Sequence, residues 1–357
     1  DLIIDNPLIR TLSFENIKKI FTTFYFGNYQ PLHLVSYSIE YHFWKLNPTG
    51  YHAVSLFMFL ITTSLVYYFT YLLGNKNKML AIIATLLFAI NAMRVESVAW
   101  AAERKDTLYS IFYVAALIAY LKYVLFEKEN SKTKWSLLLY AFIFFTFSIF
   151  SKVMAVSIVG AMVMIDFYYQ RKLNLKLVLE KLPFVVLSII IGLKQVKATA
   201  SSGSIDTSDQ FSHLDRLLIV CRNLMFYIYK MIVPVNLSAF YPYPTVATNI
   251  SWPAEFYFAP VFVLIVLGLV IWSLKFNRVI FFTAGFIVAA LALVLQYVAV
   301  GPAMFNERYS LIPAIALSFA IAYFCVYLIE KYPASKQIVF GSAGAYLLVM
   351  FYLTFTR

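Results

Sequence analysis

The chain has 357 residues, of which 62% are hydrophobic and only 13% are charged, and its formal net charge is +12. A soluble globular domain is about 45–50% apolar and about 25% charged, so this composition excludes a soluble protein and indicates an integral membrane protein. In a membrane protein the positive charge is explained by cytoplasmic loops rich in Lys and Arg and by attraction to anionic lipid. It therefore predicts no nucleic-acid partner.

Residues 1–51 are predicted to form an external loop, because they contain no run of about 20 apolar residues, the length that a membrane span requires. Ser13 is expected to be the N-cap of a short helix with apolar residues at helical spacing. Residues 34–46 are amphipathic in a similar way. Both helices are expected to lie in the membrane interface. After a turn at residues 47–50, the first span is expected at about residues 52–73.

About ten membrane spans are predicted by the same length criterion. The later ones are centred near residues 85, 116, 143, 161, 189, 265, 288, 319 and 347. Basic residues follow alternate spans, so the positive-inside rule places those connections in the cytoplasm and the others outside. This alternation requires that the amphipathic stretch 214–232 lies in the interface and does not cross. The predicted segments are the loop 1–51, the spans 52–196 with an external rim segment at 93–106, the external loop 197–254, and the spans 255–357.

The stretch Asn91–Asp106, NAMRVESVAWAAERKD, carries many charges between two apolar runs. Hydrocarbon cannot host so many charges, so this stretch is expected at the rim of the membrane. If it forms one helix, its carboxylates share one arc and two basic side chains lie opposite. The carboxylates are those of Glu96, Glu103 and Asp106, and the basic side chains are those of Arg94 and Lys105. An ordinary solvated loop is the alternative interpretation.

Further ionisable residues end spans on the same predicted side of the membrane. They are Asp1 and Asp5 in the first loop, Arg104 in the rim segment, Lys152 between two spans, and Glu307 and Arg308 before another span. Lys and Arg bind phosphate through charge-assisted hydrogen bonds, and a carboxylate opposite them can act as a general base towards a hydroxyl. The set therefore suits a substrate that is amphipathic and anionic. The structural alternatives are that Lys152 snorkels from a span end, that Arg308 pairs with Glu307, and that Asp166 on the cytoplasmic side only stabilises the fold.

Several common kinds of site have no support in the sequence. No Walker loop, GxGxxG, HExxH or GxSxG motif occurs, which argues against nucleotide binding and soluble hydrolase chemistry. Cys221 and Cys325 lie far apart in apolar surroundings, so neither a disulfide nor a metal site is expected from them. His33, His42 and His52 lack metal-ligand spacing and are interpreted as packing among aromatic side chains.

Short stretches spread along the chain carry a family resemblance. They are DNPLI (5–9), YQPL (29–32), LNPTGYHAVSL (46–56), VESVAWAAERKDTL (95–108), SKVMAV (151–156), EKLPF (180–184), FYPYP (240–244) and ERYSLIP (307–313). Together they resemble the membrane part of the TPR-containing O-mannosyltransferase family, within the GT-C fold of polyprenol-phosphate-sugar glycosyltransferases.

The resemblance implies an all-α integral membrane protein, a GT-C-type polytopic helical bundle with its active site on the external face. It implies inverting transfer of a mannose-like sugar from a polyprenyl phosphate carrier to a hydroxyl on a protein or an envelope glycan. Asp1 would be the catalytic base, and Lys152 and Arg308 would hold the carrier phosphate. The sugar or carrier pocket would be formed by Glu96, Glu103, Arg104, Asp106, Tyr29 and Tyr309. No metal ligand is assigned and the need for a divalent metal is left open, while the expected partners are the lipid-linked sugar donor, the hydroxyl acceptor and membrane lipid.

The expected location is the bacterial inner membrane, with the active site on the periplasmic face. Because the chain opens at Asp1 without Met, it is also expected to be a fragment of a longer polypeptide. A transporter or lipid flippase is the main alternative, since intramembrane charges also mark permeation paths. A transporter should show internal repeats with interrupted spans, and none stands out here. A non-catalytic scaffold of the cell envelope is the third hypothesis. The sequence leaves open the donor sugar, the acceptor and the oligomeric state.

Overall fold

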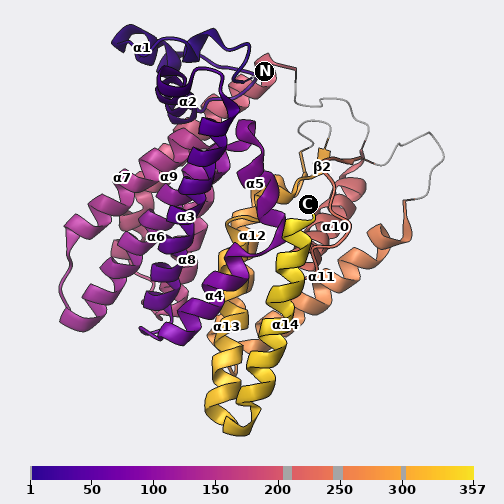
Figure 1. The fold of residues 1–357 in the computed structure, drawn as a ribbon. Helices are drawn as coiled ribbons and strands as arrows, with labels where there is room; N and C mark the ends of the chain where they lie inside the picture. Colours follow the sequence, from indigo (N-terminus) through magenta and orange to yellow (C-terminus); the bar gives the residue numbers. More distant parts are fainter. Residues whose placement is uncertain (1, 204–210, 244–251, 299–302) are drawn as a thin grey trace. The chain divides into compact units, whose positions relative to one another are not determined.

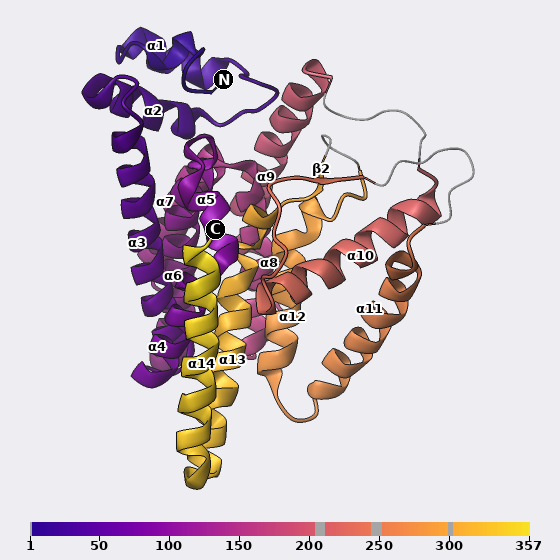
Figure 2. The same ribbon diagram turned by 45° about the vertical axis from the view of Figure 1, so that its right-hand side comes forward.

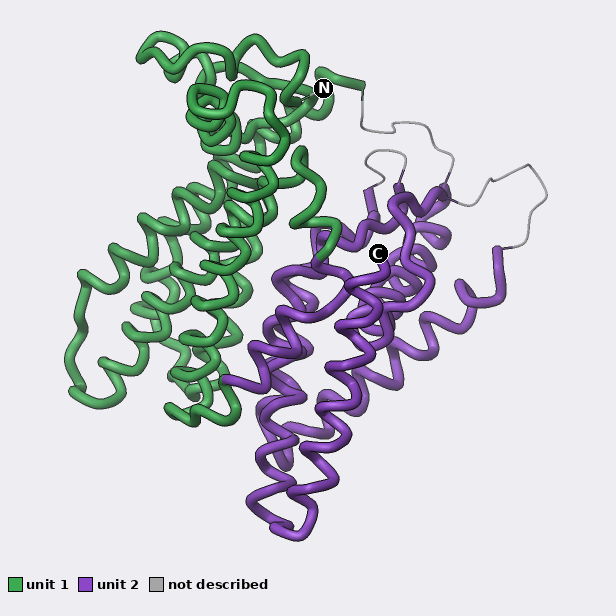
Figure 3. The backbone as a smooth tube through the Cα atoms, in the orientation of Figure 1, with its two compact units in different colours: residues 1–81, 95–203 green, residues 82–94, 204–357 purple. Residues whose placement is uncertain are grey.

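The computed structural model describes residues 2–203, 211–243, 252–298 and 303–357. The chain divides into two compact units (Figure 3). The first unit contains residues 1–81 and 95–203, and the second contains residues 82–94 and 204–357. Neither unit is a continuous piece of the chain, because residues 82–94 belong to the second unit while the residues on both sides of them belong to the first. The division into four segments expected from the loops does not coincide with these two units and stays a prediction.

Every predicted span falls on a helix of the structure. These helices are α3 (Pro48–Leu73), α4 (Lys78–Ala89), α6 (Lys105–Asn130), α7 (Trp135–Ser151), α8 (Ile158–Tyr168), α9 (Leu175–Ser201), α11 (Ala254–Ser273), α12 (Arg278–Leu291), α13 (Pro313–Lys331) and α14 (Lys336–Phe355). Among the described residues, five helices are long and apolar enough to cross a membrane, and a sixth is reached if α4 and its continuation, bent by 60°, form one span. The chain is thus a multi-pass membrane protein with five or six candidate spans, and the figure of ten stays a prediction.

The first unit is a helical bundle around α6 (Figure 1). Helix α6 packs against α3 and α7, and most of its apolar span is buried inside the protein. At one end of the unit, the short elements η1 (Pro7–Ile9), α1 (Phe14–Thr22) and α2 (Pro31–Trp44) share a small apolar cluster with the start of α3. Ser13 caps α1 as predicted, its hydroxyl accepting a hydrogen bond from the Asn16 N–H. The predicted turn at residues 47–50 is instead the first turn of α3, because Asn47 and Pro48 provide its N-cap and first residue.

The rim segment does not form a single helix. It consists of η2 (Ala92–Arg94), α5 (Val95–Ala99) and η3 (Ala101–Glu103), followed by the start of α6. Trp100 has extended backbone angles, φ −84° and ψ 103°, and interrupts the helical turns. The common arc of three carboxylates is therefore not formed, since the helical phase is lost at Trp100. The two-unit division also separates residues 91–94, which include Arg94, from the rest of this stretch.

The second unit pairs α10 (His213–Ile232) with α11, and α12 and α14 with α13 (Figure 2). Two short strands, β1 (Tyr241–Pro242) and β2 (Ala303–Phe305), pair antiparallel and join the FYPYP loop to the chain before the ERYS turn. That turn is η6 (Glu307–Ser310). No sequence pattern predicts this pairing.

Helix α10 is not among the candidate spans, in agreement with the sequence prediction. Much of its polar arc is turned into the protein, whereas several of its apolar side chains are exposed. Asn223 and Lys230 are buried and donate to backbone carbonyls of neighbouring loops. In contrast, Leu214 and Leu217 are 66% and 52% exposed. An amphipathic helix with this arrangement suits a membrane surface, with lipid covering its apolar side.

Candidate functional site

Arg104 is the centre of a charged cluster in the first unit. Its side chain is 0% exposed, and it forms an ion pair with Glu40 of α2. Its Nε lies 3.3 Å from the Ser55 hydroxyl, and an Nη donates to the Tyr51 carbonyl at 3.2 Å. The guanidinium carbon also lies 4.8 Å from the centre of the Tyr37 ring. This arrangement joins α2, the start of α3 and the rim segment, and it ties the LNPTGYHAVSL stretch to VESVAWAAERKDTL.

Glu40 has an unusual environment for a carboxyl group. Burial raises the pKa of Glu40 from its ordinary 4.5 to about 7, although the Arg104 guanidinium acts in the opposite direction. Glu40 was not among the residues expected to form the site. The position gives no signal in the sequence, because a single Glu on an amphipathic helix is normally a solvated residue.

The raised pKa predicts a pH-dependent contribution of Glu40 to stability. Between about pH 4.5 and 7, the folded state retains a proton that the unfolded state has released, so the free energy of unfolding decreases as pH rises through this window. The Glu40→Gln variant lacks this titration. Thermal unfolding of both proteins from pH 4.5 to 8 should show the wild type losing stability relative to the variant up to about pH 7. A constant difference over that range would contradict the assignment.

Asp106 and Lys152 form a second buried pair at the same end of the first unit. Asp106 lies in the first turn of α6, and Lys152 follows α7 as its C-cap. The two side chains form an ion pair, with Asp106 0% and Lys152 5% exposed. The Lys152 ammonium also lies 5.5 Å from the centre of the Tyr109 ring. Lys152 is thus fixed in a protein interior by a carboxylate, and it does not snorkel to a free surface.

His33 lies close to these cations. Its ring centre is 4.4 Å from that of Tyr37, which agrees with the predicted aromatic packing. The pKa of His33 is well below its ordinary value, first because of burial and then because of the charges of Lys105, Arg104 and Lys152. The imidazole is therefore neutral at pH 7 and contributes no charge beside the two ion pairs.

The other predicted residues of the first unit have separate positions. Glu103 is buried and pairs with Lys105 at 3.2 Å, and Glu96 is half-buried on α5. Tyr29 is buried against α9, with its N–H donating to the Gln195 side chain at 3.0 Å. Asp1, the predicted base, lies outside the described residues.

Glu307 is the centre of a charged cluster in the second unit. Its carboxylate forms an ion pair with Arg357 and accepts a hydrogen bond of 2.7 Å from the Tyr241 hydroxyl. The Glu307 carbonyl accepts from Ser310, whose hydroxyl in turn accepts from Arg94 at 2.7 Å. The FYPYP loop, the ERYS turn and the first residues of the rim segment therefore meet here. The sequence did not indicate Arg357 as a partner of Glu307, and the alternative in which Arg308 pairs with Glu307 stays a prediction.

Arg308 and Tyr309 are half-buried neighbours on η6, and the guanidinium carbon of Arg308 lies 5.2 Å from the centre of the Tyr309 ring. Lys152 belongs to the first unit and Arg308 to the second, so the meeting of these two cations around one phosphate stays a prediction. Within the described residues, no group of three or more His, Cys, Asp or Glu side chains is placed to hold a metal ion.

Comparison with known proteins finds partial sequence similarity to one group of named proteins. The chain is 29% identical over 93 residues to the mouse protein O-mannosyl-transferase TMTC1, and 30% identical over 95 residues to human TMTC3. It is 25% identical over 152 residues to human TMTC2, a match that covers 43% of this chain. The chain is similar to the TMTC protein O-mannosyl-transferases. The matched regions span 10–18% of the length of these relatives and 26–43% of this chain. No protein-family model matches the chain.

Proposed function

We propose that this protein is a membrane glycosyltransferase that moves a sugar, with mannose as the first candidate, from a polyprenyl phosphate carrier to a hydroxyl acceptor on the external face. The observation that carries the proposal is the buried Asp106–Lys152 pair, which lies in two of the stretches that resemble O-mannosyltransferases. The similarity to proteins named protein O-mannosyl-transferases supports the same reaction class. It also favours a Ser or Thr hydroxyl of a protein as the acceptor.

The proposed reaction is a single displacement at the anomeric carbon. The acceptor oxygen forms a bond to that carbon, the bond to the carrier phosphate breaks, and a carboxylate takes the proton of the acceptor hydroxyl. Polyprenyl phosphate leaves with additional negative charge, which Lys152 and Arg308 stabilise. Asp1 is the proposed base by resemblance. Asp106 is proposed as a positioning residue that holds the Lys152 ammonium in a site of low dielectric.

The charged clusters of the first unit support an enzyme more than a transporter. Arg104, Asp106 and Lys152 occupy the ends of helices α6 and α7, away from the middle of the apolar spans. A transport path places its charged groups near the midplane of the membrane. The external face, the lipid-linked donor and the bacterial inner membrane are parts of the proposal.

The proposal is tested with a double variant that removes both charges of the pair. In Asp106→Asn/Lys152→Gln the buried groups stay polar and of similar size, so the protein is expected to fold. Transfer of tritiated mannose from polyprenyl phosphate mannose to a Ser/Thr-rich peptide should fall by about 100-fold or more, the usual effect of losing one preorganised charge-stabilising group. Purified protein in lipid nanodiscs is assayed, and size-exclusion chromatography reports the folded fraction.

The matched control is Asp166→Asn/Lys181→Gln, which removes a buried Asp–Lys pair from the opposite end of the same unit. This variant should keep transfer within a few-fold of the wild type. Wild-type transfer by the Asp106/Lys152 variant would refute the phosphate-binding role of Lys152. Equal losses in both variants would show that the effect comes from disturbed packing.

A further inference from the structure

A second charged network lies at the other end of the first unit, where no part of the transfer reaction is placed. Arg171 bonds three carboxylates: Asp166 at 2.9 Å, Glu180 at 2.8 Å and Glu127 at 2.5 Å. Lys176 pairs with Glu127, and Lys181 pairs with Asp166. Three carboxylates are thus balanced by three cations. We call these six residues the Arg171 network.

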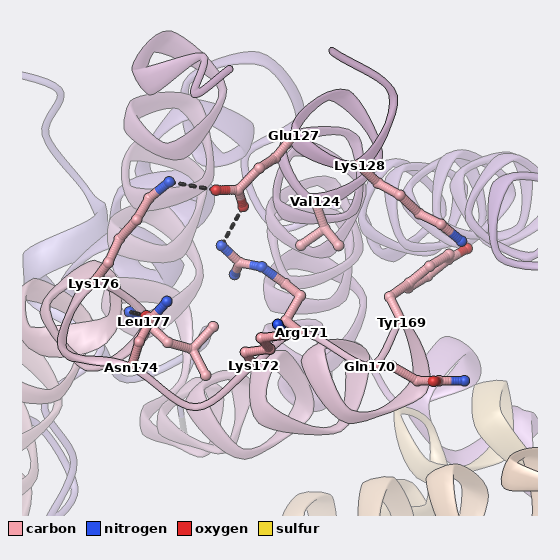
Figure 4. A pocket seen from close by; sticks show the side chains of 10 residues that line it. All are labelled: Val124, Glu127, Lys128, Tyr169, Gln170, Arg171, Lys172, Asn174, Lys176 and Leu177. Atoms are coloured by element: carbon pink, nitrogen blue, oxygen red, sulfur yellow. Dashed lines mark hydrogen bonds and ion pairs between the residues drawn. The ribbon is translucent and has the colours of Figure 1, made fainter. Parts of the chain in front are cut away.

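A cavity of about 270 Å³ opens beside the Arg171 network, between the end of α6 and the connection from α8 to α9. Figure 4 shows Glu127 between Arg171 and Lys176 on one side of it. Lys128 and Lys172 also line the cavity and are exposed. Their charges are additional to the balanced network, and the Lys128 ammonium is kept near the opening by the ring of Tyr169, 5.5 Å away. The cavity therefore carries an excess of positive charge and suits an anion.

An apolar groove of about 700 Å³ adjoins this cavity and shares Lys176 with it. The groove runs between α7 and α9 and is lined mainly by large apolar side chains, including Leu139, Phe142 and Leu179. Its volume lies within the range of about 300–1,000 Å³ that is typical of small-molecule sites. A site with a cationic end and an apolar length matches a molecule with an anionic head and a hydrocarbon chain.

We propose that the cavity and the groove together bind one anionic membrane lipid, with its phosphate beside Lys128 and Lys172 and one acyl chain in the groove. The connections after α6 and after α8 are both predicted to be cytoplasmic, so the lipid belongs to the cytoplasmic leaflet. Cationic pockets among membrane helices on that side are known to bind anionic headgroups. This site is separate from the proposed transfer site and would exist in a transporter or a scaffold as well.

The headgroup half of the proposal is tested by native mass spectrometry of the full chain with phosphatidylglycerol and with phosphatidylcholine of identical acyl chains. Wild-type protein should retain phosphatidylglycerol in preference. The Lys128→Gln/Lys172→Gln variant should lose about tenfold or more in affinity for it, because it removes the two ammonium groups of the cavity that are proposed to bond the lipid phosphate directly. The control Lys132→Gln/Lys134→Gln removes the same charge from the exposed connection after α6, outside the cavity, and should bind as the wild type does. Equal losses in the two variants would overturn the site.

The proposed binding of an acyl chain in the groove is tested by narrowing the groove. Leu179→Trp places a larger side chain in its wall, whereas Val178→Trp changes an exposed neighbour that is not among the residues lining it. Only Leu179→Trp should weaken binding of phosphatidylglycerol. Inorganic phosphate added in excess should leave the bound lipid in place. Displacement of the lipid by inorganic phosphate, or unchanged lipid binding by Leu179→Trp, would overturn the proposal of a lipid site.

Discussion

Substitution of Arg171 by methionine is expected to destabilise the protein by about 3–5 kcal/mol, the usual effect of removing one partner from a buried ion pair. The side chain is the common partner of Glu127, Asp166 and Glu180. Without it, three carboxylates from α6, α8 and α9 lie close together with only Lys176 and Lys181 to balance them. Fluorescence-detected size-exclusion chromatography after a temperature ramp should show a large decrease in the midpoint of unfolding.

The controls for Arg171 separate charge from geometry. Arg171→Lys keeps the charge but has no planar fork to bond several carboxylates at once, so an intermediate loss is expected. Lys132→Met removes an exposed cation and should change stability by less than about 0.5 kcal/mol. If Arg171→Met and Lys132→Met unfolded at the same midpoint temperature, the Arg171 network would contribute nothing to stability.

Substitution of Arg104 by methionine should have a comparable effect at the opposite end of the same unit. The guanidinium is completely buried, and its loss leaves the Ser55 hydroxyl and the Tyr51 carbonyl without this donor. Glu40 can avoid part of the penalty by taking up a proton, because its pKa is already raised. The expected loss is therefore about 3 kcal/mol at neutral pH and smaller at pH 5. Thermal unfolding at the two pH values gives the measurement.

The double variant Arg104→Met/Glu40→Gln tests whether the two charges act as a pair. It removes both, and it should be more stable than Arg104→Met alone at pH 8, where an isolated Glu40 carboxylate would have to be buried with a charge. If the two substitutions were simply additive at pH 8, the ion pair would have no energetic coupling.

The helices of this protein follow from its sequence because their cause is local. Runs of apolar residues between polar connections predict the positions of α3, α4, α6 to α9 and α11 to α14, and the Ser13 cap predicts the start of α1. The absence of α10 from the candidate spans was also predictable, since its polar residues recur on one arc of the helix. The number of membrane crossings was harder to predict from the sequence, because α7, α8 and α12 are apolar but shorter than a usual membrane span.

The partners of the charged residues could not be predicted in the same way. Glu40 and Arg104 come from distant parts of the chain, as do Glu307 and Arg357, and no periodic pattern links them. A helical wheel drawn for the rim segment is misleading, because the extended residue Trp100 interrupts the helix. The residues after Trp100 therefore point in directions that a single helix does not predict. The residue types of the site were therefore recognisable in the sequence, and two of the predicted residues, Asp106 and Lys152, form an ion pair in the structure. The contributions of Glu40, Tyr241 and Arg357 become evident only from the folded structure.

The passage of residues 82–94 through the second unit has a consequence for biosynthesis. This segment is bonded to parts of the chain that are made much later: Asn91 donates to the carbonyl of Met231, and Ile90 accepts from Thr354. During translation this segment lacks these hydrogen-bond partners until the later helices are synthesised. The first unit, in contrast, can already form most of its internal contacts by that time. Contacts between distant parts of a chain form slowly. The last steps of maturation are therefore expected to be the docking of this early segment against late helices, and a ribosome stalled before α10 should leave α4 open to proteases or chaperones.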